Sequence, residues 1–417
     1  MASLGEGPLA GVRILDVTRI LSGPFGSQVL ADLGADVVKV EDPVKGDETR
    51  GYPPFYPKGV SHYFAAINRN KQSVAVDLRR PEGQQVVRRL VGAADVLLEN
   101  FRPGRMAAWG LGYDDVRAAN PRIIYCSISG FGPDGPLSGR VAFDIVTQAM
   151  AGAMSINGQP DGDPLRLGLP IGDLIGGLNA ALGILAALRE RDATGRGQLV
   201  DVSLFDGVLG LLGYLAQRYF LTGASPPRTG SQHLSLAPYG VFRVQDGHVV
   251  IAILVDSFWP KLCQALGAPE LIEDDRFATN ADRVANRSVL TAILESHLTR
   301  HPQATWEARF EAAGIPYAPI QTVGEALEHP QADHRRMVER VDHPTEGPMR
   351  VLGRPIKLSQ HRDPPPLLPP PLLGQQTRSV LREWGGYADG DVDELDRQGV
   401  LAAPPEPPAP RAGGGAS

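Results

Sequence analysis

Short apolar runs alternate with longer segments of helical periodicity through the first half of the chain. Runs rich in Val and Ile between polar or glycine positions predict strands at 12–17, 35–41, 73–78, 95–100, 122–128 and 198–203. Between them, helical spacing predicts helices at 28–33, 81–91, 174–194 and 204–220. Because strands and helices alternate, we predict an α/β fold with a largely parallel sheet covered on both faces.

The pattern changes after residue 222. Residues 223–236 are rich in Ser, Pro and Gly, as loops are, and 238–252 have the pattern of two strands around an Asp246-Gly247 turn. We therefore predict a large domain at 1–222, completed by about 340–390, and a smaller α+β domain at 223–335. The Pro- and Gly-rich residues 391–417 are predicted to be a disordered tail.

Composition excludes several classes of function. The 417 residues are 42% hydrophobic and 21% charged, and the formal charge of −6 is mixed along the chain, so we expect no nucleic-acid partner. We find no N-terminal leader and no run of 18 apolar residues, so we expect no membrane partner and a cytoplasmic protein. The two cysteines, Cys126 and Cys263, lack CxxC spacing, so we expect neither a zinc site nor a disulfide.

One carboxylate stands at the start of the longest predicted helix. Asp173 lies in the stretch Leu169-Pro170-Ile171-Gly172-Asp173, ahead of the apolar run 178–188, and Gly195 is placed to end the helix. An acid at this position can cap the helix by accepting hydrogen bonds from its free N–H groups. It can also be a nucleophile whose oxyanion those N–H groups stabilise, although most Asp residues at such positions are only caps. The local sequence leaves both interpretations open.

The first predicted strand–helix–strand unit, residues 12–41, has the outline of a nucleotide-binding unit. Glu41 ends the second strand, as a ribose-binding acid would. The intervening loop does not contain GxGxxG, because Pro24 and Phe25 fill places where a dinucleotide motif needs bare backbone. We therefore expect no NAD site.

Motifs spread over residues 9–385 resemble those of the family III CoA transferases. They include Leu21-Ser22-Gly23-Pro24, Asn68-Arg69-Asn70-Lys71, Glu99-Asn100-Phe101-Arg102-Pro103-Gly104, Ser127-Ile128-Ser129-Gly130-Phe131-Gly132, Ile171-Gly172-Asp173, Thr194-Gly195-Arg196-Gly197-Gln198 and Gly314-Ile315-Pro316. The resemblance implies a Rossmann-like large domain, a smaller domain and a homodimer of two interlocked chains. It also implies an enzyme with no permanently bound cofactor, for which CoA and acyl-CoA are substrates.

By this resemblance Asp173 matches the catalytic aspartate of the family. The implied reaction moves CoA between carboxylic acids through an aspartyl anhydride and an aspartyl-CoA thioester. The N–H groups that follow Asp173 are candidate oxyanion donors. The motifs are most similar to those of members that act on dicarboxylates with succinyl-CoA as donor.

The resemblance also implies contacts to CoA. Asn100, Phe101, Val76 and Arg79 match family positions, and Arg102, Arg105 and Arg140 are candidate phosphate partners by position. Each of these three arginines could equally be a solvated surface residue. Many members have an arginine where this chain has Ala108, and we expect Arg105 to replace it.

Two other functions share this scaffold. The α-methylacyl-CoA racemases carry a proton-transferring His directly before an Asp-Ile pair, and here that place is Phe143, before Asp144-Ile145. Phe143 and Asp144 are therefore expected near the site, with Phe143 as a buried aromatic. A non-catalytic acyl-CoA-binding protein is the other alternative. His233 stands in a loop that could line the site or form polar surface.

Overall fold

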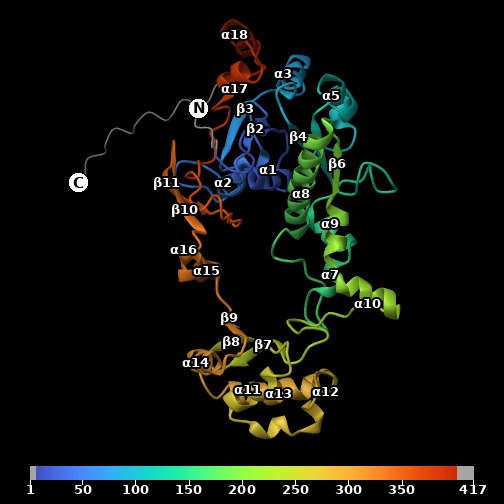
Figure 1. Ribbon diagram of the computed structural model, residues 1–417, viewed down its shortest axis with the longest axis vertical. Coiled ribbons are helices and arrows are strands. Elements are labelled where there is room, and N and C mark those ends of the chain that lie inside the picture. The colour runs from blue at the N-terminus through green and yellow to red at the C-terminus, as the bar shows by residue number, and fades with distance from the viewer. Residues whose placement is uncertain (1–5, 402–417) are drawn as a thin grey trace, which may run out of the picture. The chain divides into compact units, whose positions relative to one another are not determined.

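The computed structural model describes residues 6–401, which divide into two compact units (Figure 1). The first unit comprises the residues up to 153, 167–214 and 331 onward. The second comprises 154–166 and 215–330. The chain therefore leaves the first unit and returns to it, and the second unit is an insertion.

A six-stranded sheet is the centre of the first unit. All of its neighbouring strands are parallel, in the order β3-β2-β1-β4-β5-β6. This is the strand order of the Rossmann fold, and it confirms the predicted α/β class with a parallel sheet. The strands are β1 (Arg13–Asp16), β2 (Asp36–Glu41), β3 (Lys71–Ala75), β4 (Val96–Glu99), β5 (Ile124–Ser129) and β6 (Leu199–Ser203).

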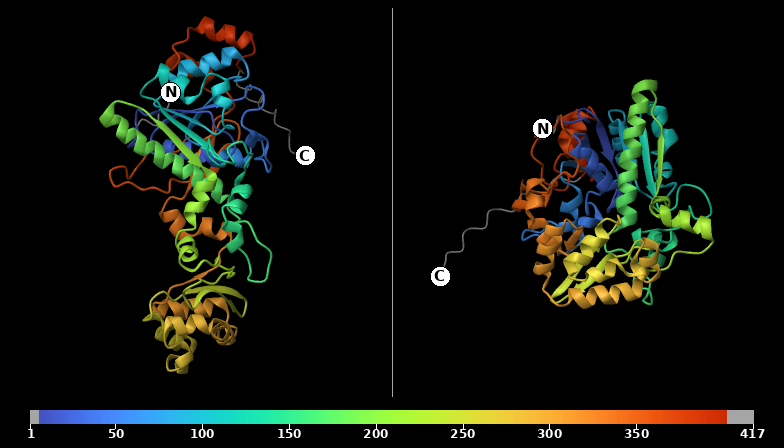
Figure 2. Two further views of the ribbon diagram at one scale, coloured as in Figure 1. Left: turned by 90° about the vertical axis from the view of Figure 1, so that its right-hand side faces the viewer. Right: turned by 60° about the horizontal axis from the view of Figure 1, so that its bottom comes forward.

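Helices cover both faces of this sheet because successive strand residues point to opposite sides. Ile14 belongs to one buried cluster and Leu15 to another. The face of Ile14 is covered by α1 (Ser22–Asp32) and the long α8 (Ile171–Thr194), which runs along the sheet (Figure 2). The face of Leu15 is covered by α3 (Pro81–Val91), α5 (Tyr113–Ala119), α17 (Thr377–Glu383) and α18 (Asp389–Arg397).

The first helix begins earlier than the sequence predicts. Residues 19–27 are predicted as a loop and 28–33 as a helix, but α1 starts at Ser22. Pro24 is tolerated because it lies in the first turn, where no intrahelical N–H is needed. Gly26 lies against α8, where an added Cβ would stand 2.6 Å from the carbonyl oxygen of Gly177. The glycines therefore serve close helix packing.

The predicted helix at 204–220 is two helices. Gly213, with φ of 47°, separates α9 (Leu204–Leu211) from α10 (Tyr214–Thr222). Upstream of α8 lie α6 (Asp144–Met150) and α7 (Ala153–Ile156). Gly195, with φ of 74°, ends α8 as predicted.

Among the described residues, α8 alone is long and apolar enough to cross a membrane by length and composition. The sequence analysis looked for 18 consecutive apolar residues, and Asp173 and Asn179 interrupt such a run in α8, whereas this test averages hydropathy over a window. Ala180, Ala181 and Ile184 of α8 are buried against the sheet. Core helices that pack in this way pass the same test, so the finding is weak evidence for a membrane span.

The C-terminal segments return to the first unit. The strands β10 (Val338–His343) and β11 (Gly347–Leu352) form an antiparallel hairpin after α16 (Pro330–His334). Part of the predicted disordered tail is folded, because Val392 of α18 is buried and Leu401 pairs with Val76. The apolar positions of 389–401 complete the core, which outweighs the polar composition. The rest of that tail, 402–417, lies outside the described residues.

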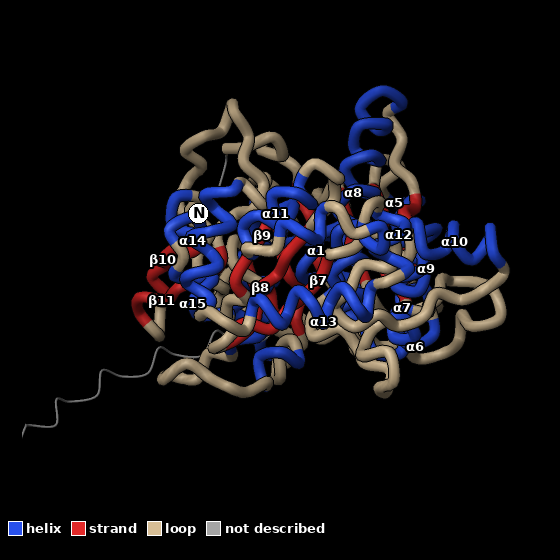
Figure 3. Tube along the Cα trace, turned by 90° about the horizontal axis from the view of Figure 1, so that it is seen from below, coloured by secondary structure: helices blue, strands red, loops and turns tan. Residues whose placement is uncertain are grey.

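The second unit has its own sheet and core (Figure 3). Its antiparallel strands are β7 (Tyr239–Val244), β8 (Gly247–Ala252) and β9 (Tyr317–Pro319), and the predicted hairpin joins the first two. Its helices include most of α10 together with α11 (Phe258–Leu266), α12 (Asn280–Ala285), α13 (Arg287–Leu298), α14 (Gln303–Ala313) and α15 (Val323–Glu328).

Candidate functional site

The strand order places a crevice at the carboxyl ends of β1 and β4. Chain connections leave these two neighbouring strands toward opposite sides, and ligands of open α/β sheets bind at such a switch point. A pocket of about 470 Å³ lies here. It is lined by residues that follow β1, β2, β3 and β4, including Arg19, Lys45, Arg79, Phe101 and Arg105. We call it the switch-point pocket.

Aromatic rings and cations share one wall of the switch-point pocket. The Phe101 and Trp109 rings meet edge to face with centroids 5.2 Å apart. The Arg19 guanidinium carbon lies 4.8 Å from the Phe101 centroid, and that of Arg105 lies 5.6 Å from the Trp109 ring. A flat aromatic surface next to guanidinium groups suits a ligand with a planar base and phosphates.

Acidic side chains form ion pairs with several of the cations that line the switch-point pocket. Arg79 pairs with Asp77 at 2.7 Å and with Asp42 at 3.1 Å. Lys45 and Arg105 have no ion pair within residues 6–401, so they are the pocket cations left for an anionic ligand.

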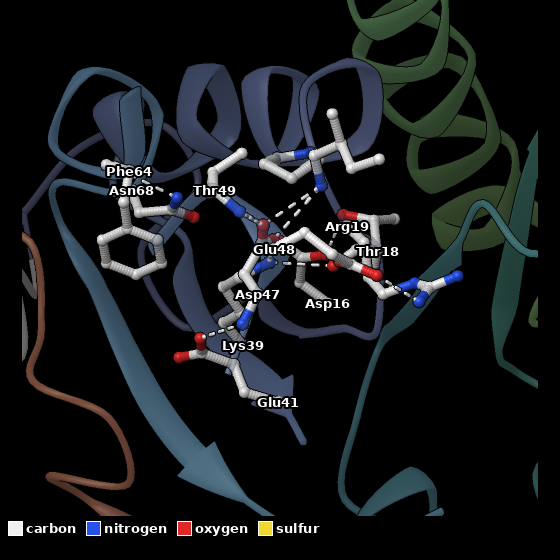
Figure 4. A network of polar contacts seen from close by, with 12 residues as sticks. Asp16, Thr18, Arg19, Lys39, Glu41, Asp47, Glu48, Thr49, Phe64 and Asn68 are labelled. Atoms are coloured by element: carbon white, nitrogen blue, oxygen red, sulfur yellow. Dashed lines mark hydrogen bonds and ion pairs between the residues drawn. The ribbon is translucent and has the colours of Figure 1, made fainter. Parts of the chain in front are cut away.

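The loop between β1 and α1 is held in a strained conformation by a buried carboxylate (Figure 4). Ile20 has φ of 68°, which is a genuine outlier for a β-branched residue. Its N–H donates to both carboxylate oxygens of Asp47, at 3.2 and 3.3 Å. Asp47 also accepts from the backbone N–H of Thr49 at 2.9 Å. The loop is therefore fixed before any ligand arrives.

Two buried ion pairs support this loop from below. Lys39 lies 2.8 Å from Asp47 and donates to the carbonyl of Thr18, and Lys71 lies 3.3 Å from Asp16. Burial alone would raise the carboxyl pKa values, but the neighbouring lysines hold the pKa of Asp16 and of Asp47 below their usual range. Burial lowers the pKa of Lys71 to about 8.

Asn100 also holds the loop. Its Oδ1 accepts from the backbone N–H of Arg19 and its Nδ2 donates to the Arg19 carbonyl, both at 2.8 Å. The predicted role of Asn100 was a CoA contact, and the structure gives its side chain a structural task beside the pocket. Asp47 and Asn100 together fix the two residues at the strained turn.

Asp173 lies in the first turn of α8, half-buried, on the face that approaches α1. Gly176 and Gly177, one turn further along, pack against Ser22 and Gly26. Burial, and then the negative charge of Asp144, raise the pKa of Asp173 to about 7. A carboxylate without a charge partner is poorly solvated, and this favours nucleophilic attack.

Asp173 is not the N-cap of its helix. The helix starts at Ile171, and the N–H of Gly172 donates to Asp144 at 2.8 Å. The N–H of Leu174 donates to the Pro170 carbonyl at 3.0 Å. The predicted oxyanion donors after Asp173 are therefore already bonded inside the helix, and that prediction is wrong.

Tyr63 is a neighbour of Asp173 that the sequence did not point to. It lies on α2 (His62–Ile67), and its ring meets that of Tyr52 edge to face at 5.6 Å. Burial, followed by the charge of Asp173, raises the pKa of Tyr63. The phenol and the carboxylate are therefore close enough to interact.

The other predicted site residues are scattered. Val76 is buried and lines the switch-point pocket with Arg79, whereas Arg102 is exposed in a separate 230 Å³ pocket. Arg140 lies on an exposed loop. The ring of His233, in the second unit, lies 5.1 Å from that of Tyr239 and is tilted 56° to it.

The Phe143 side chain is 62% exposed, so its prediction as a buried aromatic is wrong. The backbone at the start of α6 turns Phe143 outward and the next residue, Asp144, inward to α8. Phe143 is thus separated from the Asp144 contact that supports the Asp173 helix.

Arg19, Lys45 and Trp109 line the switch-point pocket and were missed from the sequence. Arg19 and Lys45 follow the first two strands, so their positions after strand ends were a usable signal. Trp109 follows the short α4 (Arg105–Ala108), and nothing in the local pattern turns it toward a pocket.

Comparisons with known proteins agree with this geometry. The model of CoA-transferase family III matches residues 9–377. The chain is 41% identical over 394 residues to succinyl-CoA:glutarate CoA-transferase of Mus musculus, covering 94% of this chain and 90% of that one. It is 40% identical over 380 residues to acetyl-CoA:oxalate CoA-transferase of Acetobacter aceti, covering 91% and 96%.

A solved structure gives the same result. A CAIB/BAIF family protein from Brucella suis superimposes with a TM-score of 0.81 at 40% identity, covering 91% of this chain and 99% of that one. The matches span both units and include the strands that form the switch-point pocket. The chain belongs to CoA-transferase family III.

Proposed function

We propose that this enzyme, an acyl-CoA:carboxylate CoA transferase, uses Asp173 as its nucleophile and moves CoA from succinyl-CoA to a dicarboxylic acid. The observation that carries the proposal is the raised pKa of Asp173, about 7, on a helix that packs closely against α1, the helix that follows the loop beside the switch-point pocket. Relatives named for succinyl-CoA and glutarate support the choice of substrates.

In the proposed reaction a carboxylate oxygen of Asp173 attacks the thioester carbonyl carbon, the C–S bond breaks, and CoA leaves as thiolate. The thiolate then attacks the aspartyl carbonyl of the anhydride, which releases the donor acid and leaves an aspartyl-CoA thioester. The acceptor carboxylate attacks the carbonyl carbon of that thioester, the C–S bond breaks, CoA leaves again as thiolate, and a second anhydride forms. Its acyl carbon, on the acceptor side, is finally attacked by CoA thiolate, and the Asp173 carboxylate is regenerated.

We place CoA in the switch-point pocket. The Phe101–Trp109 wall provides a surface for adenine, and Lys45 and Arg105 are available for phosphates. Arg105 lines this pocket while Ala108, where many family members carry an arginine, does not. This supports the replacement of that arginine by Arg105.

We further propose a cytoplasmic homodimer with interlocked chains, because the family resemblance implies it. The mass of the protein in solution, measured by light scattering at micromolar concentration, tests the dimer. A monomer at that concentration would contradict it.

Mass spectrometry tests the nucleophile. The protein is mixed with succinyl-CoA, trapped with hydroxylamine and digested, and we expect hydroxamate on the peptide that contains Asp173. Asp173→Asn should abolish the label and Asp144→Asn should keep it. A label on another residue, or solvent deuterium entering the α-carbon of the acyl group without any label, would contradict the proposal.

A further inference from the structure

A second concave region of the first unit carries an excess of positive charge. A pocket of about 370 Å³ lies between α16 and the segment that follows β11. We call it the basic pocket. Its charged lining comprises one acid, Glu339, the histidines His334 and His361, and the cations Arg335, Arg336, Arg354, Lys357 and Arg362. It shares no lining residue with the switch-point pocket.

The acids near the basic pocket account for only two of its cations. Glu339 pairs with Arg336 at 3.1 Å, and Asp32 faces Arg354. Within residues 6–401, no ion pair involves Arg335, Lys357 or Arg362. The protein therefore places three uncompensated cations around one cavity.

Arg354, which lines the same cavity, has an unsatisfied donor. Its Nε is buried and has no hydrogen-bond partner in the described part of the chain. Arg354 therefore brings a cation with an unpaired donor to the lining of the basic pocket.

The cations also disfavour one another. Burial, and then the charges of Arg335 and Arg336, lower the pKa of Lys357. Like charges held around one cavity destabilise the empty protein, and a bound anion reverses the sign of this contribution. A bound anion with a single negative charge would leave most of the excess positive charge of the basic pocket in place.

We propose that the basic pocket binds a small phosphate-bearing anion with at least two negative charges. Guanidinium and ammonium groups together are typical of phosphate recognition, and the pocket volume fits a small phosphorylated molecule. This site is separate from the one proposed for CoA, and it stands whether or not that proposal holds.

Calorimetric titration of inorganic pyrophosphate into the full chain tests the proposal. We expect saturable binding at one site per chain that weakens as salt is added. The double variant Arg335→Gln/Lys357→Gln should lose at least about tenfold in affinity. The control Lys261→Gln/Arg300→Gln removes the same charge from exposed positions of the second unit and should leave the affinity unchanged.

Two further measurements separate this pocket from other sources of binding. Arg105→Gln changes the switch-point pocket, so pyrophosphate binding should survive in it. Succinate, a dicarboxylate, should bind at least about tenfold more weakly than pyrophosphate. Thermal melting of each variant confirms that it is folded.

Any of three results would overturn the proposal. In the first, pyrophosphate shows no saturable binding. In the second, Arg105→Gln loses pyrophosphate binding while the double variant keeps it. In the third, succinate binds with the same affinity as pyrophosphate. If the double variant alters the mass of the protein in solution while pyrophosphate does not bind, the basic pocket is instead a contact between chains.

Discussion

Two groups of carboxylates in the first unit have opposite electrostatic settings. Asp16 and Asp47, below the β1–α1 loop, each lie beside a buried lysine, and the pKa of each is lowered. Asp173 lies near another acid, Asp144, and its pKa is raised to about 7. Both groups are buried wholly or in part, so the presence or absence of a cation decides the direction of the shift.

The difference separates carboxylates that stabilise the fold from the carboxylate proposed to react. Paired charges hold the strained turn at Ile20 and remain ionised over a wide pH range. Of these three carboxylates, Asp173 has no cation beside it, and it is the one whose pKa lies near neutral pH. Four substitutions test this difference between paired and unpaired charges.

Asp173→Asn should give the largest loss of activity, about a thousandfold or more, because the amide cannot form the anhydride. It should not destabilise the protein. Since the folded pKa of Asp173 exceeds its ordinary value of 3.8, ionisation disfavours the native state as pH rises from 3.8 through about 7. At pH 8 the variant should therefore melt at or above the wild-type temperature. A lower melting temperature would contradict the assigned direction of the pKa shift.

Asp47→Asn should have the opposite profile, with a large loss of stability. It leaves Lys39 buried without its charge partner, which costs about 3–5 kcal/mol in comparable buried pairs. Urea unfolding followed by circular dichroism measures the change. The adjacent Glu48→Gln is the matched control, because the Arg19–Glu48 pair is exposed and should contribute little. Equal effects of the two variants would refute a special role for the buried pair.

Asp144→Asn should shift the pH dependence of the rate. Removing the neighbouring negative charge lowers the pKa of Asp173, so more of the nucleophile is ionised at pH 6. The ratio of kcat/KM at pH 6 to that at pH 8 should rise about two- to threefold. Asn retains an oxygen for the N–H of Gly172, so the helix start is kept. A ratio that stays constant would show that burial alone sets the shift.

The strands of the sheet were predictable because each one has a recognisable local sequence pattern. Each of the six strands was located to within a few residues, since apolar runs between turns mark buried parallel strands. The start of α1 was missed because Gly23, Pro24 and Gly26 indicate a loop until their packing against α8 is known. The helix α18 was missed because its two apolar positions are buried only by contact with a core formed by residues distant in the sequence.

The candidate site was predictable only in part. Asp173 was identified by its motif, but its electrostatic setting depends on Asp144, 29 residues away in the chain. The residues of the switch-point pocket follow four different strands, and the strand order that joins them cannot be read from local spacing. For the same reason Arg102 and Arg105 appear equivalent in the sequence and lie in different pockets.

That pair gives the last and smallest predicted effect. Arg105 lines the switch-point pocket and carries no acid partner, whereas Arg102 lines the 230 Å³ pocket beyond β5. Arg105→Gln should raise the KM for acyl-CoA about fivefold with little change in kcat, because a phosphate contact is equally strong in the ground state and the transition state. Arg102→Gln should leave both constants within about twofold, as exposed charges usually do. Steady-state kinetics with succinyl-CoA measure both variants. If Arg102→Gln has the larger effect on KM, CoA lies across the second pocket. The absence of an acid partner beside a cation would then not decide where the nucleotide binds.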